Sequence, residues 1–215
     1  MAPDTPAKPT KRAAQAAETK RRLIEVAIEV FSESDYDQVN VADIAARAEV
    51  AHGLLFHYFG NKRGIYLAAV RTTATQLGAA FVFESGSTPA ELVRAALRRH
   101  LDYLRDHRGL ALRLVLGGRG ADPEAWEVYE TARWNALEAF AAVAEIDPTA
   151  PALRLVGRAT ISAIDEAIVQ WLDDTDAFDA DHLVHWMESL IIACIRTANV
   201  LDPDLDLEDA ISVFG

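Results

Sequence analysis

One stretch in the first third of the chain combines imidazole, phenol and cationic side chains at helical spacing. The segment HGLLFHYF offers hydrogen-bonding tips and a small residue that permits close approach, and a lysine follows: His52, Gly53, His57, Tyr58 and Lys62. Such tips can meet base edges in the major groove of DNA, which is about 12 Å wide. A lysine at a helix start can face a phosphate together with the free helix amides. The chemistry indicated is recognition of DNA.

Three predicted helices would position these groups. The pattern KRRLIEVAIEVFSES places its apolar residues on one side and predicts an amphipathic helix that ends near Ser34. Asn40 precedes a short helix over VADIAARA, and a break at 49–51 leads to the second short helix at 52–59. Gly60–Asn61 ends that helix, and a long helix is expected from Lys62 to about Glu84. Two short helices under a longer one form a helix-turn-helix, whose second helix enters the major groove.

The segment 41–62, VADIAARAEVAHGLLFHYFGNK, resembles the DNA-binding signature of TetR-type (tetracycline-repressor-like) transcriptional regulators. The matching positions are Ile44-Ala45, Val50, the aromatic run at 56–59 and Lys62. The resemblance covers residues 18–70. It implies an all-α protein that represses transcription, with a second helical domain that binds a small-molecule effector and pairs two copies. A homodimer would read a palindromic double-stranded DNA operator, because symmetric half-sites need paired readers.

Three positions depart from the family pattern: Ala51 replaces a common serine, Leu54 a common threonine and Phe56 a common tyrosine. Leu54 can offer only an apolar contact, for example to a thymine methyl group. Leu55, Phe56 and Phe59 are expected to pack within the domain rather than to contact DNA. The expected DNA contacts are His52, Gly53, Leu54, His57, Tyr58, Asn61, Lys62, Arg21 and Arg22.

The charge of the chain is divided unevenly. The net charge is −12, yet residues 1–70 carry nine Lys and Arg against nine Asp and Glu. The cations from Lys8 to Arg22 form either a DNA-binding arm or a solubilising tail, and the sequence leaves both readings open. We therefore expect a flexible basic arm at 1–17, a DNA-binding domain at 18–65 and a helical ligand-binding and dimerisation domain at 66–215.

The larger domain has helical apolar spacing throughout, so about nine helices and no strands are predicted for the whole chain. Large aromatics with sparse polar groups on three of its helices are typical of a small-molecule pocket, and equally of an aromatic core. The ligand would be apolar or amphipathic. The candidate pocket residues are His100, Tyr103, Trp126, Tyr129, Arg133, Trp134, Ile161, Ile164, Asp165 and Ile168.

The last two long helices have apolar faces that look too broad for one core contact. A small-residue stripe and a bulky stripe are the candidate dimer interface, with burial inside one chain as the alternative. The residues of the two stripes are Ala159, Ala163, Ala167, Trp186, Leu190, Ile191 and Cys194.

Several classes of function are disfavoured. One cysteine permits no internal disulfide or cysteine-based zinc cage, and no apolar run approaches the roughly 18 residues of a membrane span. His182 and His185 lie beside Asp179 and Asp181, but a solvated helix start explains them better than a metal site. The glycine-rich Gly117–Gly120 indicates a helix connection. We expect a cytoplasmic protein with no catalytic activity, cofactor or metal; the alternative is a DNA-binding dimer with a solid core and no effector.

Overall fold

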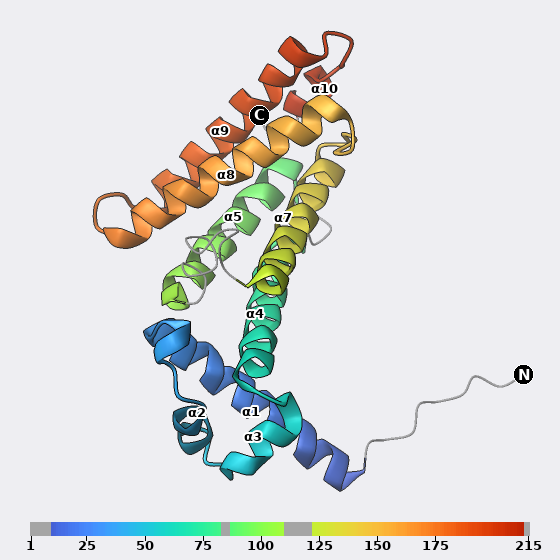
Figure 1. Cartoon of the computed structure of the whole chain (residues 1–215). Coiled ribbons are helices and arrows are strands. Elements are labelled where there is room, and N and C mark those ends of the chain that lie inside the picture. Colours follow the sequence, from blue (N-terminus) through green and yellow to red (C-terminus); the bar gives the residue numbers. More distant parts are fainter. Residues whose placement is uncertain (1–9, 83–86, 110–121, 213–215) are drawn as a thin grey trace, which may run out of the picture. The chain divides into compact units, whose positions relative to one another are not determined.

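The computed structural model describes residues 10–82, 87–109 and 122–212 of the chain. Over these ranges it holds nine α-helices, one short 3₁₀ helix and no strand, which confirms the predicted all-α fold (Figure 1). The expected connection at Gly117–Gly120 lies outside the described residues. The chain divides into an N-terminal unit, Met1–Thr72, and a C-terminal unit, Thr73–Gly215.

Helix α1 (Lys11–Glu33) begins earlier than the sequence predicted. Thr10 caps it, because its hydroxyl accepts a hydrogen bond from the Ala13 amide at 3.2 Å. Residues 11–17, which were expected to be part of a flexible arm, are therefore helical. Leu23, Ala27 and Phe31 form the buried face of α1, and the helix ends at Glu33, close to the predicted Ser34.

The two short helices lie where the sequence predicted them. Helix α2 (Val41–Arg47) is capped by Asn40, whose side chain accepts a hydrogen bond from the Ala42 amide at 3.0 Å. A 3₁₀ turn, η1 (Tyr36–Gln38), precedes it, and α3 (His52–Phe59) follows. Between α2 and α3 the chain turns at Glu49, which has a left-handed φ of 54°.

The junction between α3 and α4 (Lys62–Ala79) leaves no room for a side chain at Gly64. A Cβ atom at this position would lie 1.9 Å from the carbonyl oxygen of Phe59. Asn61 caps α4, since its Oδ1 accepts a hydrogen bond from the Gly64 amide at 2.8 Å. The helix ends at Ala79, short of the predicted Glu84, which itself lies outside the described residues.

The boundary between the units falls within α4, after Thr72, rather than at the expected residue 65. The core of the N-terminal unit draws on all four of its helices, through the buried residues Leu23, Ala27, Phe31, Ile44, Ala45, Leu55 and Ile65. This core holds α3 by one face only, with Leu55 as its fully buried residue.

The C-terminal unit is built from five further described helices with clear start signals. A capping box opens α5 (Pro89–Asp106), where Thr88 and Glu91 exchange hydrogen bonds at 2.9 and 3.3 Å. Asp122 caps α7 (Pro123–Val143), and a proline begins α8 (Pro151–Asp173). Asp179 caps α9 (Ala180–Leu201), and the short α10 (Glu208–Ser212) follows. Helices α8 and α9 lie side by side (Figure 1).

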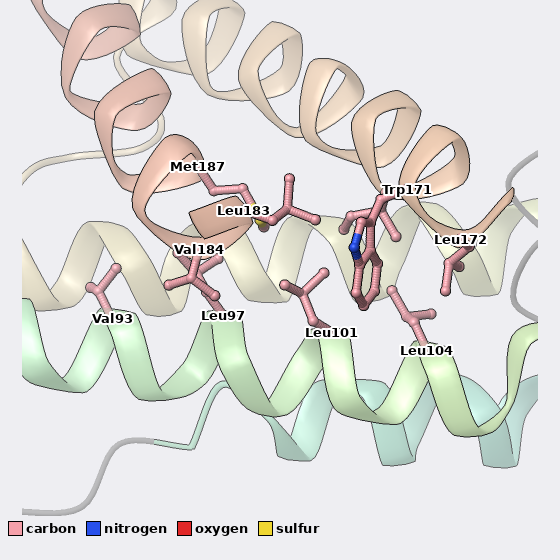
Figure 2. Packing of buried hydrophobic residues seen from close by; sticks show 10 residues of the cluster. Val93, Leu97, Leu101, Leu104, Trp171, Leu172, Leu183, Val184 and Met187 are labelled. Atoms are coloured by element: carbon pink, nitrogen blue, oxygen red, sulfur yellow. The ribbon is translucent and has the colours of Figure 1, made fainter. Parts of the chain in front are cut away.

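Helices α5, α8 and α9 meet in the main apolar core of the C-terminal unit (Figure 2). Leu97, Leu101 and Leu104 of α5 face Trp171 of α8 and Met187 of α9. A second apolar cluster joins α8, α9 and α10 through Leu153, Val156, Ala198 and Leu207, among others. None of the described helices is long and apolar enough to span a bilayer.

Candidate DNA interface and effector site

The exposed face of α3 carries three of the predicted DNA contacts. His52, Gly53 and His57 are exposed, whereas Leu54 and Tyr58 are half-buried. The His57 ring lies edge-on to the Tyr58 ring, with centroids 5.4 Å apart. The imidazoles of His52 and His57 are therefore exposed to solvent, and the phenol of Tyr58 is partly buried in the domain.

Phe56 is the residue of this helix that differs from expectation. It was expected to pack inside the domain, as Leu55 does, but its side chain is 38% exposed. Its ring meets the edge of the His52 ring, with centroids 4.9 Å apart. The helical register explains the difference, because position 55 points into the core and position 56 is rotated from it by about 100° around the helix axis.

Lys62 and Asn61 both have partners within the N-terminal unit. The ammonium of Lys62 donates a hydrogen bond to the carbonyl oxygen of Asp37 at 3.2 Å and lies 4.7 Å from the centroid of the Tyr36 ring. Asn61 caps α4 as described above, so its side-chain oxygen is already bonded to Gly64. The structure thus gives Lys62 and Asn61 local structural roles beside any contact with DNA.

The predicted arm residues lie on the exposed side of α1. Arg21 pairs with Glu18 at 2.5 Å and also with Glu25. Arg22 is exposed, and Lys20 lies 6.0 Å from the centroid of the Phe59 ring. Since exposed ion pairs contribute little free energy, the pairs of Arg21 would be exchanged for phosphate contacts at small cost.

The predicted pocket residues of the C-terminal unit fall into separate environments. Ile168 belongs to the main core, and Trp134 donates a hydrogen bond to Glu138 at 2.6 Å. Trp126 contacts Tyr129, with ring centroids 5.4 Å apart. Ile161 and Ile164 line an apolar cavity. The ten residues therefore do not surround one pocket.

Four charged groups and a phenol form a network between α7 and α8. Arg133 lies 2.6 Å from Glu130 and 3.1 Å from Asp165, and it donates a hydrogen bond to Ser162 at 2.7 Å. Tyr129 donates to Asp165 at 2.8 Å, and Arg158 pairs with Glu130. Each charge of the network therefore lies beside an opposite charge, as buried charges require, although the Nε of Arg133 makes no hydrogen bond within the described part of the chain.

Burial dominates the electrostatics of this network. It raises the pKa of Asp165 and also that of Tyr129. Burial alone would raise the pKa of Glu130 as well, but hydrogen bonds from Arg158 and Arg133 hold it below its ordinary value. The network is thus a structural link between α7 and α8 in which each charge already has a partner.

His100 on α5 is a predicted pocket residue that stands apart from this network. Its Nδ1 is buried and has no hydrogen-bond partner within the described part of the chain. Burial lowers the pKa of His100 to about 4, so the imidazole is neutral at pH 7. Its ring lies 5.2 Å from that of Phe81, which in turn lies 5.5 Å from that of Phe140. Tyr103, one turn further along α5, donates to Gln76 at 2.6 Å.

This partly open cavity lies between α7, α8 and α9 and has a volume of about 70 Å³. Its lining is almost wholly apolar, and most of it was missed by the sequence analysis: Leu137, Phe140, Ala141, Ala144, Ile146, Pro148, Leu153, Val156, Gly157, Thr160, Ile191 and Ile195. Gly157 was the available signal, because a glycine inside a helix indicates close packing. A Cβ atom there would lie 2.6 Å from a methyl group of Leu137.

The predicted dimer residues divide between the surface and the interior. Ala159 and Ala163 of α8 are exposed, Ala167 is half-buried, and Trp186 of α9 is 46% exposed. In contrast, Ile191 packs against the main core and Cys194 against the second cluster, while Leu190 is half-buried. Further apolar groups that the sequence analysis did not select are exposed on these two helices: Leu155, Val200 and Leu201.

A wider groove lies at the end of the α8–α9 pair. It measures about 510 Å³ and is lined by Trp171, Phe178, Leu183 and Trp186, among others. His182 lines the groove as well and lies 3.6 Å from Asp179. Across the residues that the structure describes, no group of three or more His, Cys, Asp or Glu could hold a metal ion.

Residues 23–69 match the family model described as bacterial regulatory proteins, tetR family. A HTH-type transcriptional repressor of Mycobacterium tuberculosis is 33% identical over 83 residues, which are 39% of this chain and 43% of the relative. The HTH-type regulator BetI 1 of Chromohalobacter salexigens is 31% identical over 86 residues, again 39% and 43% of the two chains. The matched segment thus spans less than half the length of these curated relatives.

Two solved structures share the fold over most of their length. A tetR-family transcriptional regulator from Streptomyces coelicolor has a TM-score of 0.80 at 22% identity, covering 91% of this chain and 87% of the other. The regulator FadR from Bacillus subtilis, solved with stearoyl-CoA, has a TM-score of 0.63 at 23% identity, covering 81% and 97%. The resemblance inferred from the sequence is confirmed.

Proposed function

We propose, from the match of residues 23–69 to the tetR family model, that the chain is a dimeric transcriptional repressor released from its operator by a small molecule. The observation that carries the proposal is α3, which is held by one buried face while His52 and His57 face solvent. A protein of this kind acts on DNA in the cytoplasm and has no catalytic activity.

In this proposal α3 enters the major groove, and cations on α1 and at the start of α4 contact the flanking phosphates. Arg21 and Arg22 are exposed, and the first 70 residues are electrically neutral although the whole chain carries −12. The affinity should fall steeply with salt, because each phosphate contact releases condensed counterions.

The second copy would pack on the exposed apolar face of α8 and α9, around Ala159, Ala163 and Trp186. Apolar side chains on this face remain open in the single chain, with Leu155 60% and Val200 82% exposed. Two copies related by a two-fold axis would present two α3 helices to a palindromic operator.

The effector would enter the cavity between α7, α8 and α9, whose lining calls for an apolar group. His100 does not line this cavity, but Phe81 lies between its ring and that of Phe140, which does, so an amphipathic ligand that extends past Phe140 would meet the neutral Nδ1. FadR, whose solved structure contains stearoyl-CoA, is one relative by fold with an acyl ligand. Helix α4 would transmit effector binding to the DNA-binding domain. It begins beside η1 at Lys62, and Gln76 in its last turns accepts a hydrogen bond from Tyr103 of α5.

One observation favours a second candidate, a repressor without an effector. The cavity holds only about 70 Å³, and the charged groups of the α7–α8 network are already paired. In that case the C-terminal unit would serve dimerisation alone.

The deciding experiment is selection of duplexes from a random DNA pool by the full chain, followed by release of the bound duplex with fractionated cell metabolites. We expect a palindromic site and a metabolite that weakens binding by about 5–150-fold, the usual range of allosteric coupling. Ile164→Trp should fill the cavity and abolish release, whereas Ala142→Trp on the exposed side of α7 should not. Release unchanged by Ile164→Trp would contradict this placement of the effector, and a screen without any hit would favour the second candidate.

Assembly is tested by placing a charge on the exposed face of α8. Ala163→Glu should give a monomer in sedimentation that keeps its helical circular dichroism and loses tight operator binding. Thr131→Glu, at an exposed position of α7, is the matched control and should remain a dimer. A native chain that sediments as a monomer at micromolar concentration would overturn the dimer.

A further inference from the structure

The solvent-exposed face of α3 consists of His52, Gly53, Phe56 and His57. These positions follow helical spacing on the side opposite Leu55, which is fully buried. A helix that enters the major groove presents such a face to the base edges. The side chains on it therefore decide which bases can be distinguished.

The usual reading groups are missing from this face. Arg and Lys distinguish guanine, Asn and Gln distinguish adenine, and Asp and Glu bond to cytosine. None of these six residue types occurs in α3, all of which the structure describes. Just beyond the helix, Asn61 is bonded to Gly64, and Lys62 to the Asp37 carbonyl. Bidentate recognition of a purine from α3 is thus excluded.

Phe56 is the large apolar group on this face, and it is 38% exposed. The edge-to-face contact with His52, with an interplanar angle of 68°, supports the ring from one side. A supported ring loses little conformational freedom when it is covered. The apolar feature that a base pair displays in the major groove is the 5-methyl group of thymine.

We propose that Phe56 reads the 5-methyl group of a thymine in each operator half-site. The proposal rests on the proposed function, since it requires α3 to enter the major groove. Phe56 supplies base preference through apolar contact, and the imidazoles of His52 and His57 add single hydrogen bonds beside it.

The test uses the full chain and a duplex that it has selected from a random pool. Each thymine of the half-sites is replaced in turn by deoxyuridine, which differs only in lacking the methyl group. We expect one position per half-site where the loss weakens binding about fourfold, and about 15-fold when both half-sites are changed, because a methyl-sized group is lost from an apolar contact.

Variants of Phe56 connect the effect to this side chain. Phe56→Ala should bind the thymine and deoxyuridine duplexes equally, while Phe56→Leu should keep most of the difference because it keeps an apolar surface. Thermal unfolding monitored by circular dichroism checks that both variants fold, as expected for an exposed position.

The outcomes distinguish an error in the role of Phe56 from an error in the proposed repressor function. Specific binding with no deoxyuridine effect, or an effect that persists in a folded Phe56→Ala, would overturn the reading role of Phe56 and leave the repressor intact. Failure to enrich any duplex would overturn the proposed function, and the role of Phe56 with it.

Discussion

On α3 the imidazoles of His52 and His57 face solvent, whereas between α7 and α8 the charged groups of Arg133, Glu130 and Asp165 bond to one another. The first set is solvated in the free protein and can exchange water for the polar groups of another molecule. The second set is largely removed from water, with side chains 13–19% exposed, and must be satisfied within the chain.

Polar residues near aromatic side chains therefore have different roles in the two units. In the N-terminal unit such residues are exposed to solvent, and in the C-terminal unit most of them join two helices. His100 differs from them, because its buried Nδ1 has neither a hydrogen-bond partner nor an ion-pair partner among the described residues. A polar residue thus indicates a binding site when its hydrogen-bonding capacity remains unused by the fold.

The largest expected effect is the loss of stability when the rigid α3–α4 junction of the N-terminal unit is disturbed. Gly64→Ala would place a Cβ atom 1.9 Å from a backbone oxygen that cannot move without breaking the α3–α4 junction. We expect a loss of about 3 kcal/mol or more in the free energy of unfolding of the N-terminal unit, measured by denaturant titration.

Two other glycine variants serve as matched controls for Gly64→Ala. Gly157→Ala meets only the flexible end of Leu137, which can rotate, so about 1 kcal/mol is expected. Gly53→Ala has no neighbour within 4 Å and should not destabilise α3. Equal losses for Gly64→Ala and Gly157→Ala would contradict the distinction between a rigid junction and an adaptable cavity wall.

The burial of the His100 imidazole predicts a pH dependence of stability. Above pH 6.5 both the folded and unfolded chains hold His100 neutral. As the pH falls from 6.5 to about 4, His100 binds a proton in the unfolded chain but stays neutral in the folded chain. The free energy of unfolding therefore decreases. The lowered pKa of His100 corresponds to a loss of about 3 kcal/mol in the free energy of unfolding over this pH range. His100→Leu should remove this part of the pH profile of stability.

The control for this measurement is His107→Gln, which changes an exposed histidine of the same unit. Its stability profile between pH 4 and 6.5 should follow that of the native chain. If His100→Leu loses stability with falling pH as steeply as the native chain does, the burial of a neutral His100 is wrong.

A smaller effect is expected from Lys62, whose charge can serve both the fold and DNA. Lys62→Ala should weaken binding to cognate and random duplexes alike and reduce the salt slope by about 1, because one phosphate contact is lost. Fluorescence anisotropy at several salt concentrations measures this. Arg105→Ala, a charge change on α5, should leave the slope unchanged. A loss confined to the cognate duplex would assign Lys62 to base recognition instead.

The smallest effect compares two turns of the same conformation. Glu49 lies in the turn between α2 and α3, and Glu145 follows α7; each has a φ of 54°. Glycine relieves left-handed strain but costs unfolded-state entropy, so each Glu→Gly variant should stabilise its unit by about 0.5 kcal/mol. Thermal unfolding of the two variants tests this, and destabilisation at either position would show that the glutamate side chain stabilises its turn.

The N-terminal unit could be predicted closely because its signals are local. Asn40, the turn before His52 and the Gly60–Asn61 break fix α2 and α3 through caps and backbone preferences of neighbouring residues. The predicted contacts from His52 to Lys62 lie within eleven consecutive positions. The start of α1 was placed too late, because prolines and cations before it looked like a flexible tail, and Thr10 was not recognised as a cap.

The apolar spacing and the capping residues of the sequence determined the helices themselves, including α5 with its capping box at Thr88. Tertiary structure alone decided the rest. Whether Phe56 is buried depends on the face of α3 that meets the core, and whether Ile164 or Ile168 lines the cavity depends on the relative rotation of α7, α8 and α9. A helix of mixed aromatic and polar residues fits several such rotations, and only packing against partners distant in sequence selects one.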